Sequence, residues 1–145
     1  MILRMAKSDA YLDNLGNVRL FSSCTKKELQ TIIKASDELS IKAGTVLVDQ
    51  GAAGTQSFVI LEGSATVKRN GRKIAVLGTG ATVGEMSLLD RGPRTATVVA
   101  DTDMRVLVIG QREFSALLAE VPSIALKLLA TLAGRVRDLD RANFG

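Results

Sequence analysis

Short β-type runs fill the middle of this 145-residue sequence, from Asp37 to Ile109, and they constrain the fold more than any other feature. Many short strands at such intervals, with turn signals between them, indicate a closed or rolled β architecture. The apolar side chains of these runs supply a core that is built from valine, leucine, isoleucine and alanine. The runs are Leu39–Ile41, Val46–Val48, Phe58–Leu61, Ala65–Val67, Ile74–Leu77, Thr95–Val99 and Met104–Ile109.

Turn residues separate the runs. The pair Asn70-Gly71 is a hairpin signal, because both residues tolerate a positive φ. Four cations flank this pair, and we interpret them as a solvated hairpin tip; a site for a polyanion is the alternative. The cations are Lys68, Arg69, Arg72 and Lys73. Corner positions that need a positive φ are expected at Gly44, Gly51, Gly54 and Gly63.

A two-part motif lies between Val83 and Ala100. Gly84-Glu85 opens a predicted short helical turn, and Pro93-Arg94-Thr95-Ala96 begins a strand ten residues later. A helix start offers unpaired N–H groups to an anion, and an arginine adds a forked donor for phosphate oxygens. A glutamate can accept from a sugar hydroxyl. The motif therefore predicts a socket for one phosphate attached to one ribose; the alternative is a plain turn, a short amphipathic helix and a strand with an exposed arginine.

Gly84-Glu85-Met86-Ser87-Leu88-Leu89 with Pro93-Arg94-Thr95-Ala96 resembles the phosphate-binding cassette of the cyclic-nucleotide-binding domain family. That family includes bacterial catabolite-activator-type regulators, cyclic-nucleotide-dependent kinases and gated channels. The glycine spacing around Phe58 also resembles the family's β-roll, so the resemblance covers roughly residues 18–142. It implies a mainly β fold with flanking helices: a jelly-roll-like, double-stranded β-helix roll, N-terminal helices and a long C-terminal helix.

The resemblance also implies roles for individual residues. Arg94 would neutralise the cyclic phosphate, and Glu85 would hold the ribose 2′-hydroxyl. Backbone N–H groups of Met86 and Ser87 would complete the phosphate cradle, and the Thr95 hydroxyl would cap it. The expected ligand-binding set, in which the purine lies against Val83 and the long helix, is Val83, Gly84, Glu85, Met86, Ser87, Arg94, Thr95, Ala96 and Arg135.

Composition excludes several other classes of site. The sequence has no histidine, which counts against Ser-His-Asp triads, most zinc sites and a cupin-like enzyme on a similar roll. A single cysteine, Cys24, rules out a disulfide framework and a four-cysteine iron–sulfur cluster within the chain. We therefore expect no metal, haem or iron–sulfur cofactor and no enzymatic activity. The net charge of +4 fits an anionic ligand without being a nucleic-acid signature.

The N-terminus and the overall hydropathy bear on location. Arg4, Lys7 and Asp9 interrupt the N-terminal apolar residues, so no signal peptide is expected. No apolar run approaches the length of a membrane span, so we expect no membrane partner and a cytoplasmic location.

Helical patterns flank the β-type region, and they divide one domain into three parts. Residues 1–36 hold N-terminal helices, in which Thr25 and Glu28 form a capping box ahead of an apolar face. Residues 37–110 form the roll with the cassette at 83–97. Residues 111–145 hold C-terminal helices: a short one at 112–120 and a longer one from about Ser123.

The longer helix carries an apolar stripe that changes along its length. The first half is wide (Ile124, Ala125, Leu128 and Leu129) and is expected to be buried on two sides. The second half narrows to Leu132, Val136 and Leu139, a coiled-coil-like seam that predicts a homodimer. Gly134, in mid-helix, fits either a close neighbour or simple tolerance.

The resemblance adds two expectations for this helix. Arg135 falls where bacterial members place an arginine near the ligand and the cassette glutamate. Leu139 falls where the catabolite activator has an adenine-reading threonine, so that contact is absent. The resemblance ranks cyclic AMP first, with cyclic GMP as the alternative.

The sequence thus predicts a regulatory module that binds a 3′,5′-cyclic nucleotide, relays binding through movement of the C-terminal helix and signals to a downstream protein partner. One alternative is a dimerisation or interaction module with a vestigial pocket, and another is a regulatory fragment of a transcription factor or channel. Bacterial regulators normally continue into a helix-turn-helix domain. None follows the long helix here, so no DNA binding by this chain alone is expected.

Overall fold

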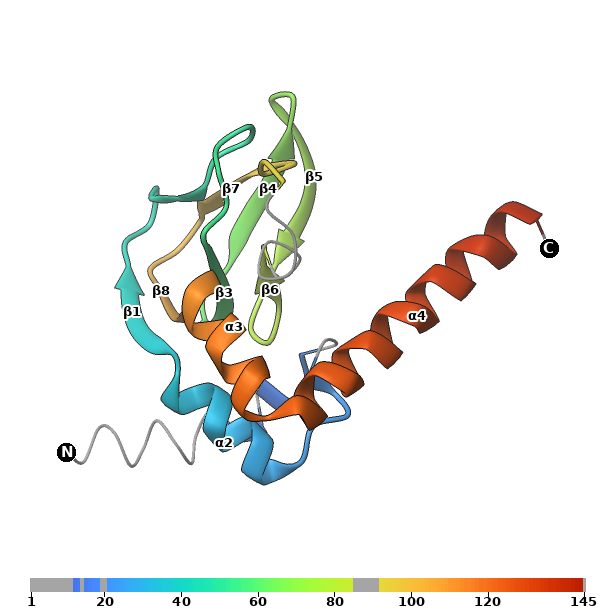
Figure 1. Ribbon diagram of the computed structural model, residues 1–145. Helices are drawn as coiled ribbons and strands as arrows, with labels where there is room; N and C mark the ends of the chain where they lie inside the picture. Colours follow the sequence, from blue (N-terminus) through green and yellow to red (C-terminus); the bar gives the residue numbers. More distant parts are fainter. Residues whose placement is uncertain (1–11, 14, 19–20, 85–91, 145) are drawn as a thin grey trace.

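The computed structural model describes residues 12–13, 15–18, 21–84 and 92–144. Eight strands form the roll, with one helix before it and two after it among the longer elements of this part of the chain (Figure 1). The helices are α2 (Lys26–Lys34), α3 (Gln111–Glu120) and α4 (Pro122–Phe144). The strands are β1 (Asp37–Ile41), β2 (Val46–Val48), β3 (Gln56–Glu62), β4 (Ala65–Arg69), β5 (Arg72–Leu77), β6 (Thr82–Val83), β7 (Thr97–Ala100) and β8 (Met104–Gly110).

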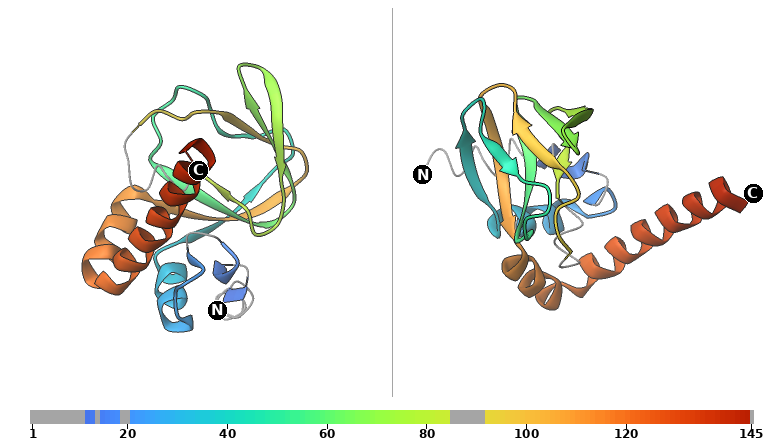
Figure 2. Two further views of the ribbon diagram at one scale, coloured as in Figure 1. Left: turned by 90° about the vertical axis from the view of Figure 1, so that its right-hand side faces the viewer. Right: turned by 90° about the horizontal axis from the view of Figure 1, so that it is seen from above.

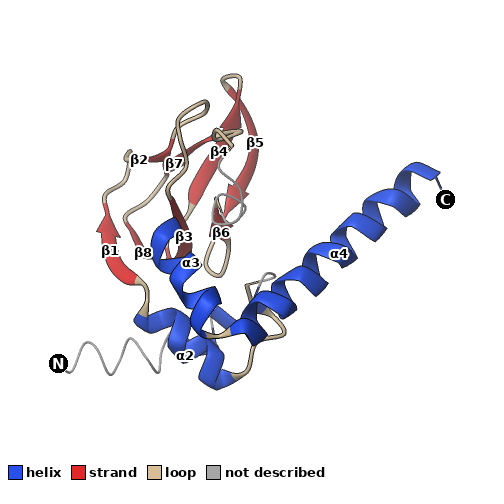
Figure 3. Cartoon of the chain, in the orientation of Figure 1, coloured by secondary structure: helices blue, strands red, loops and turns tan. Residues whose placement is uncertain are grey.

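The strands form two four-stranded antiparallel sheets, with the orders β1-β8-β3-β6 and β2-β7-β4-β5. Figure 2 shows the two sheets curling around one interior, and Figure 3 shows the helices gathered at one end of the roll. The predicted mainly β roll with flanking helices is confirmed. The two-residue strand β6, which leads into the cassette, is too short to give an alternating pattern and was not predicted.

Strands β3 and β8 are buried on both faces, and this places the helices against the roll. Phe58 and Ile60 of β3 face the core between the sheets, together with Val106 and Val108 of β8. The alternate side chains of the same two strands pack against the helices in a second core, because successive residues in a strand point to opposite faces. These alternate residues are Val59, Leu61, Leu107 and Ile109, and they pack with Phe114, Leu117, Ile124 and Leu128.

The β4–β5 hairpin confirms the predicted turn. Asn70 has φ +54° and Gly71 has φ +77°, so both central residues lie in the left-handed region that a tight hairpin turn uses. The corner prediction holds for Gly44, Gly51 and Gly63, which have positive φ values, but it is wrong for Gly54. Gly54 is buried, whereas the corners Gly44 and Gly51 are exposed.

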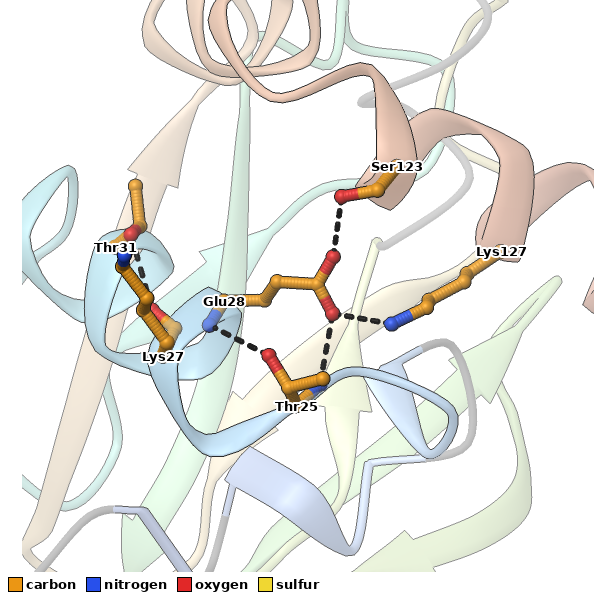
Figure 4. Close-up of polar contacts among 6 residues, drawn as sticks. All are labelled: Thr25, Lys27, Glu28, Thr31, Ser123 and Lys127. Atoms are coloured by element: carbon orange, nitrogen blue, oxygen red, sulfur yellow. Dashed lines mark hydrogen bonds and ion pairs between the residues drawn. The ribbon is translucent and has the colours of Figure 1, made fainter.

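Helix α2 begins with the predicted capping box and also contacts α4 (Figure 4). The Thr25 hydroxyl accepts from the Glu28 N–H at 3.2 Å, and the Glu28 carboxylate accepts from the Thr25 N–H at 2.7 Å. The same carboxylate accepts from the Ser123 hydroxyl and from the Lys127 ammonium in the first turns of α4. We call these four residues the Glu28 clasp. It joins the start of α2 to the start of α4, across about 100 residues of sequence.

Helix α4 turns away from α3 by 111° at Val121, and its C-terminal half projects from the roll (Figure 1). Ile124 and Leu128 are buried, as expected for a helix that covers the core. The expectation that the whole first half is buried on two sides is wrong, because Leu129 is 62% exposed. Val136 and Leu139, further along the helix, are exposed as well. No single described helix is long and apolar enough to cross a membrane; α3 and α4 meet that criterion only as a bent pair.

Candidate functional site

The cassette begins where β6 ends and resumes just before β7. Val83 is buried and lies opposite Phe58 of β3, and its carbonyl accepts from the Ser57 hydroxyl at 3.1 Å. Gly84 follows at once with φ +72°. Glu85, Met86 and Ser87, three of the predicted ligand-binding residues, lie outside the described residues. The structure therefore gives the two ends of the cassette, at Val83–Gly84 and at residues 92–96.

Arg94 is the buried cation of the cassette, with only 8% of its surface exposed. Its guanidinium donates to the carbonyl oxygen of Gly84 at 3.5 Å and to the carbonyl oxygen of Gln56. Burial lowers the pKa of Arg94 from its ordinary value, because desolvation disfavours the charged form. Arginine nevertheless stays protonated at neutral pH, so this site presents a buried positive charge with planar donors.

Gly84 allows the arginine side chain to lie against the backbone. A Cβ atom at this position would lie 1.9 Å from Nη1 of Arg94. The positive φ would in addition strain any L side chain here. Gly84 therefore serves both the turn after β6 and the close approach of the guanidinium, two requirements that glycine alone meets without strain.

The backbone of Arg94 is held by the loop that follows β2. The Arg94 N–H donates to the Ala52 carbonyl at 2.8 Å, and the Arg94 carbonyl accepts from the Gly51 N–H at 2.8 Å. An isolated bridge between Ala53 and Pro93 continues this pairing. A cavity of about 180 Å³ lies beside the arginine, and Asp49, Gln56 and Phe58 are among its lining residues.

The remaining predicted residues occupy different environments. Ala96, two residues after Arg94 in the chain, is buried, whereas Thr95 is exposed. Arg135 is half-buried on α4, and the side chains that follow it at positions 136–141 are exposed. The structure thus brings Arg94 into contact with Gly84, which follows the buried Val83 directly in the chain. Among the described residues, no group of three or more potential metal ligands lies together.

Sequence reasoning missed the residues that hold this segment from outside. Gln56 accepts a hydrogen bond from Arg94 through its backbone carbonyl. Every residue has such a carbonyl, so the sequence does not reveal this contact. Arg69 donates from Nε to the Thr95 carbonyl at 3.1 Å, although the sequence indicated only a solvated hairpin tip for it. The predicted hairpin was the one sequence feature that pointed to Arg69. Arg69 ends β4, and β4 pairs with β7, the strand that follows Thr95.

Curated relatives share the sequence pattern over most of this chain. The cyclic AMP receptor protein of Thermus thermophilus is 31% identical over 126 residues, which cover 83% of this chain and 58% of that protein. A putative potassium channel protein of Rhodopseudomonas palustris is 34% identical over 125 residues, which cover 83% of this chain and 30% of the channel. The chain thus spans little more than half of the first relative and less than a third of the second.

Solved structures share the fold. The N-terminal domain of a transcriptional regulator from Streptomyces coelicolor A3(2) superposes with a TM-score of 0.82 at 30% identity, covering 90% of this chain and 94% of that one. The catabolite activator protein of Thermus thermophilus superposes with a TM-score of 0.73 at 31% identity, covering 86% of this chain and 61% of that one. The regulatory domain of Toxoplasma gondii PKA, solved with cAMP, gives a TM-score of 0.72 at 29% identity, with 77% and 44% coverage.

The family described as "Cyclic nucleotide-binding domain" matches residues 38–121, which include both sheets, the cassette and α3. Some relatives carry such a domain within an enzyme: glutaminase 2 of Bradyrhizobium diazoefficiens is 33% identical over 121 residues, which are 19% of its length. The buried cassette arginine, the roll and the family match agree, and the chain belongs to the catabolite-activator-like cyclic nucleotide-binding domain family.

Proposed function

We propose that this domain binds a 3′,5′-cyclic nucleotide at the cassette, with Arg94 neutralising the phosphate. The observation that carries this proposal is the burial of the Arg94 guanidinium against the carbonyls of Gly84 and Gln56. Burying a cation is costly unless charged or polar partners offset the cost, and a bound phosphate would add charge-assisted bonds. Met86 and Ser87 would add backbone N–H groups, and the Thr95 hydroxyl would cap the phosphate. Val83, Ala96, Arg135 and α4 would border the nucleotide.

Glu85 is proposed to hold the ribose 2′-hydroxyl. The wild type should bind a 2′-deoxy cyclic nucleotide about tenfold more weakly than the parent, because a hydrogen bond to a charged acceptor is lost. Glu85→Gln should reduce that difference. Isothermal titration of both ligands against both proteins measures it. Equal affinity of the wild type for the two ligands would remove the ribose role from this account.

Cyclic AMP is proposed as the preferred ligand, with weak discrimination against cyclic GMP. The base-reading contact that the resemblance places at position 139 is absent, since Leu139 has no hydrogen-bonding group. We expect the two affinities to lie within about tenfold, because roughly one hydrogen bond distinguishes the bases. Thr95→Ala should weaken cyclic GMP more than cyclic AMP, because the hydroxyl can accept from the guanine 2-amino group. A hundredfold preference of the wild type for either base would contradict this expectation.

Signal relay is proposed to run through α4 and a homodimer. Leu129, Val136 and Leu139 are each more than 60% exposed, and with the half-buried Leu132 they follow a 3–4–3 spacing. Such a seam fits a second α4 in a coiled-coil arrangement. Three expectations stay predictions: that the domain signals to a downstream protein partner, that this chain alone does not bind DNA, and that the protein is cytoplasmic.

Val136→Glu should shift the protein from dimer to monomer, because a carboxylate in the seam would be buried without a partner. Ala130→Glu is the matched control: it adds the same side chain to an exposed position on another face of α4 and should leave the mass unchanged. Sedimentation equilibrium measures both variants. A wild type that is monomeric at high micromolar concentration would refute the dimer.

A further inference from the structure

The tip of the β4–β5 hairpin is bonded to the segment that carries Arg94. Arg69 donates from Nε to the carbonyl of Thr95, the residue that follows Arg94, at 3.1 Å. One residue further along the hairpin, Asn70 exchanges two hydrogen bonds with Gln50. The Asn70 N–H donates to Oε1 of Gln50, and Nε2 of Gln50 donates to Oδ1 of Asn70, both at 2.9 Å. The hairpin therefore contacts the Arg94 segment directly, at Thr95, and it also contacts the loop after β2, at Gln50.

Gln50 connects these contacts to the backbone of the cassette. Its N–H donates to the Thr97 hydroxyl at 3.0 Å, and that hydroxyl donates to Asp49 at 2.9 Å. The next residue, Gly51, donates its N–H to the Arg94 carbonyl. The chain from Arg94 to Thr97 is thus held by the loop after β2, and that loop is held by the hairpin tip. We call Arg69, Asn70 and Gln50 the hairpin brace.

The hairpin's own stability does not explain its charges. Arg69 lies directly opposite Arg72, and Lys68 lies directly opposite Lys73. Like charges placed opposite each other destabilise a β pair. All four side chains are exposed, and within the described residues Arg72 makes no side-chain hydrogen bond or ion pair, whereas Arg69 bonds the Thr95 carbonyl. The bond from Arg69 to the Thr95 carbonyl therefore links the hairpin to the cassette and does not stabilise the hairpin itself.

We propose that the hairpin brace positions Arg94 for its anionic ligand, with Arg69 as the positioning residue. This inference rests on the proposed cyclic-nucleotide site. Arg69 fixes the peptide that follows Arg94 through the Thr95 carbonyl, and the Gln50–Asn70 pair fixes the loop that pairs with the Arg94 backbone. A guanidinium whose backbone is held in advance loses less freedom when it meets a phosphate, so the brace contributes to affinity without touching the ligand.

The test compares Arg69→Met with Arg72→Met. Both variants remove one positive charge from the same exposed hairpin, so both change long-range attraction of an anion equally, but only Arg69→Met breaks a bond to the cassette. We expect Arg69→Met to bind cyclic AMP about three- to tenfold more weakly, mainly through faster dissociation, and Arg72→Met to stay within about twofold of the wild type. Stopped-flow release of a fluorescent cyclic nucleotide gives the rates, and titration calorimetry gives the affinities.

Two further measurements separate positioning from charge and from stability. Gln50→Leu removes the amide pair without changing the net charge and should weaken binding in the same direction. The ³¹P signal of bound cyclic AMP should move in Arg69→Met and not in Arg72→Met, because the phosphate environment changes only in the first. Thermal unfolding of the ligand-free proteins should differ little among the variants at these exposed positions.

Several outcomes would overturn the inference. Equal losses of affinity in Arg69→Met and Arg72→Met would assign the effect to charge alone. A lower unfolding temperature of ligand-free Arg69→Met with unchanged affinity and an unchanged ³¹P signal would assign Arg69 to structure alone. If the wild type binds a cyclic nucleotide and both variants bind it equally well, the proposed role of the hairpin brace is overturned and the proposed function stands. If the wild type binds no cyclic nucleotide, both proposals are overturned.

Discussion

Arg94→Ala is expected to abolish most of the affinity for a cyclic nucleotide. The substitution removes a buried guanidinium whose fork can donate to phosphate oxygens, a loss of about 2–5 kcal/mol, or about 30-fold to several thousand-fold in Kd. Arg94→Lys keeps the charge but loses the fork, so it should bind with intermediate affinity. Titration calorimetry of the three proteins against cyclic AMP measures the series.

The control for Arg94 is Arg112→Ala. Arg112 is exposed on α3, and its removal changes the net charge by the same amount. It should leave the affinity within about twofold of the wild type. Circular dichroism should show that Arg94→Ala retains the fold. Unchanged affinity of a folded Arg94→Ala protein would show that Arg94 is not the phosphate ligand.

Glu28→Ala is expected to lower stability by about 2–3 kcal/mol, because it removes a helix cap and two bonds to α4. Glu28 is 8% exposed, and its carboxylate accepts from Thr25, Ser123 and Lys127. For a chain of this size the unfolding temperature should fall by roughly 5–10 °C. Glu120→Ala, at an exposed position at the end of α3, is the matched control and should shift it little. Equal shifts in both variants would contradict the Glu28 clasp.

The Glu28 clasp should also weaken in acid. Hydrogen bonds from Lys127, Ser123 and Thr25 lower the pKa of Glu28 from 4.5 to about 2 in the folded chain. A lowered folded-state pKa means that the unfolded chain takes up the proton first, so this stabilisation is complete above about pH 4.5 and is lost as the pH falls towards 2. Between these values the free energy of unfolding should fall more steeply for the wild type than for Glu28→Gln. Parallel curves in thermal unfolding at pH 6, 4 and 3 would contradict this.

The parts of the fold that local sequence determines were predictable. Thr25 and Glu28 are three residues apart, so their capping box could be predicted from spacing alone, and Asn70-Gly71 indicated its own turn. The partners of Glu28 on α4, Ser123 and Lys127, lie about 100 residues away, and no local pattern connects them. The exposure of Leu129 was mispredicted for a related reason: the stripe on α4 is apolar, but the bend at Val121 decides how much of it meets the roll.

The candidate site was predictable where one side chain carries the chemistry and unpredictable where the backbone does. Arg94 could be identified from its motif, and its burial agrees with the role proposed for it. The bonds accepted by the carbonyls of Gln56 and Thr95 could not be predicted. They depend on the strand register and on where the β4–β5 hairpin lies, and both are set only in the assembled roll. Arg69 shows this most clearly. Its sequence context is a charged, exposed turn, yet its Nε reaches the residue after Arg94 because β4 lies beside β7.

Titration calorimetry of the wild-type protein with cyclic AMP, cyclic GMP and linear 5′-AMP tests the central claim most directly. We expect saturable binding of both cyclic nucleotides with affinities within about tenfold of each other, because roughly one hydrogen bond distinguishes the bases. Linear 5′-AMP, whose phosphate is not tied to the ribose 3′-oxygen, should bind far more weakly. Absence of binding by either cyclic nucleotide at millimolar concentration, from a protein that circular dichroism shows to be folded, would contradict the account.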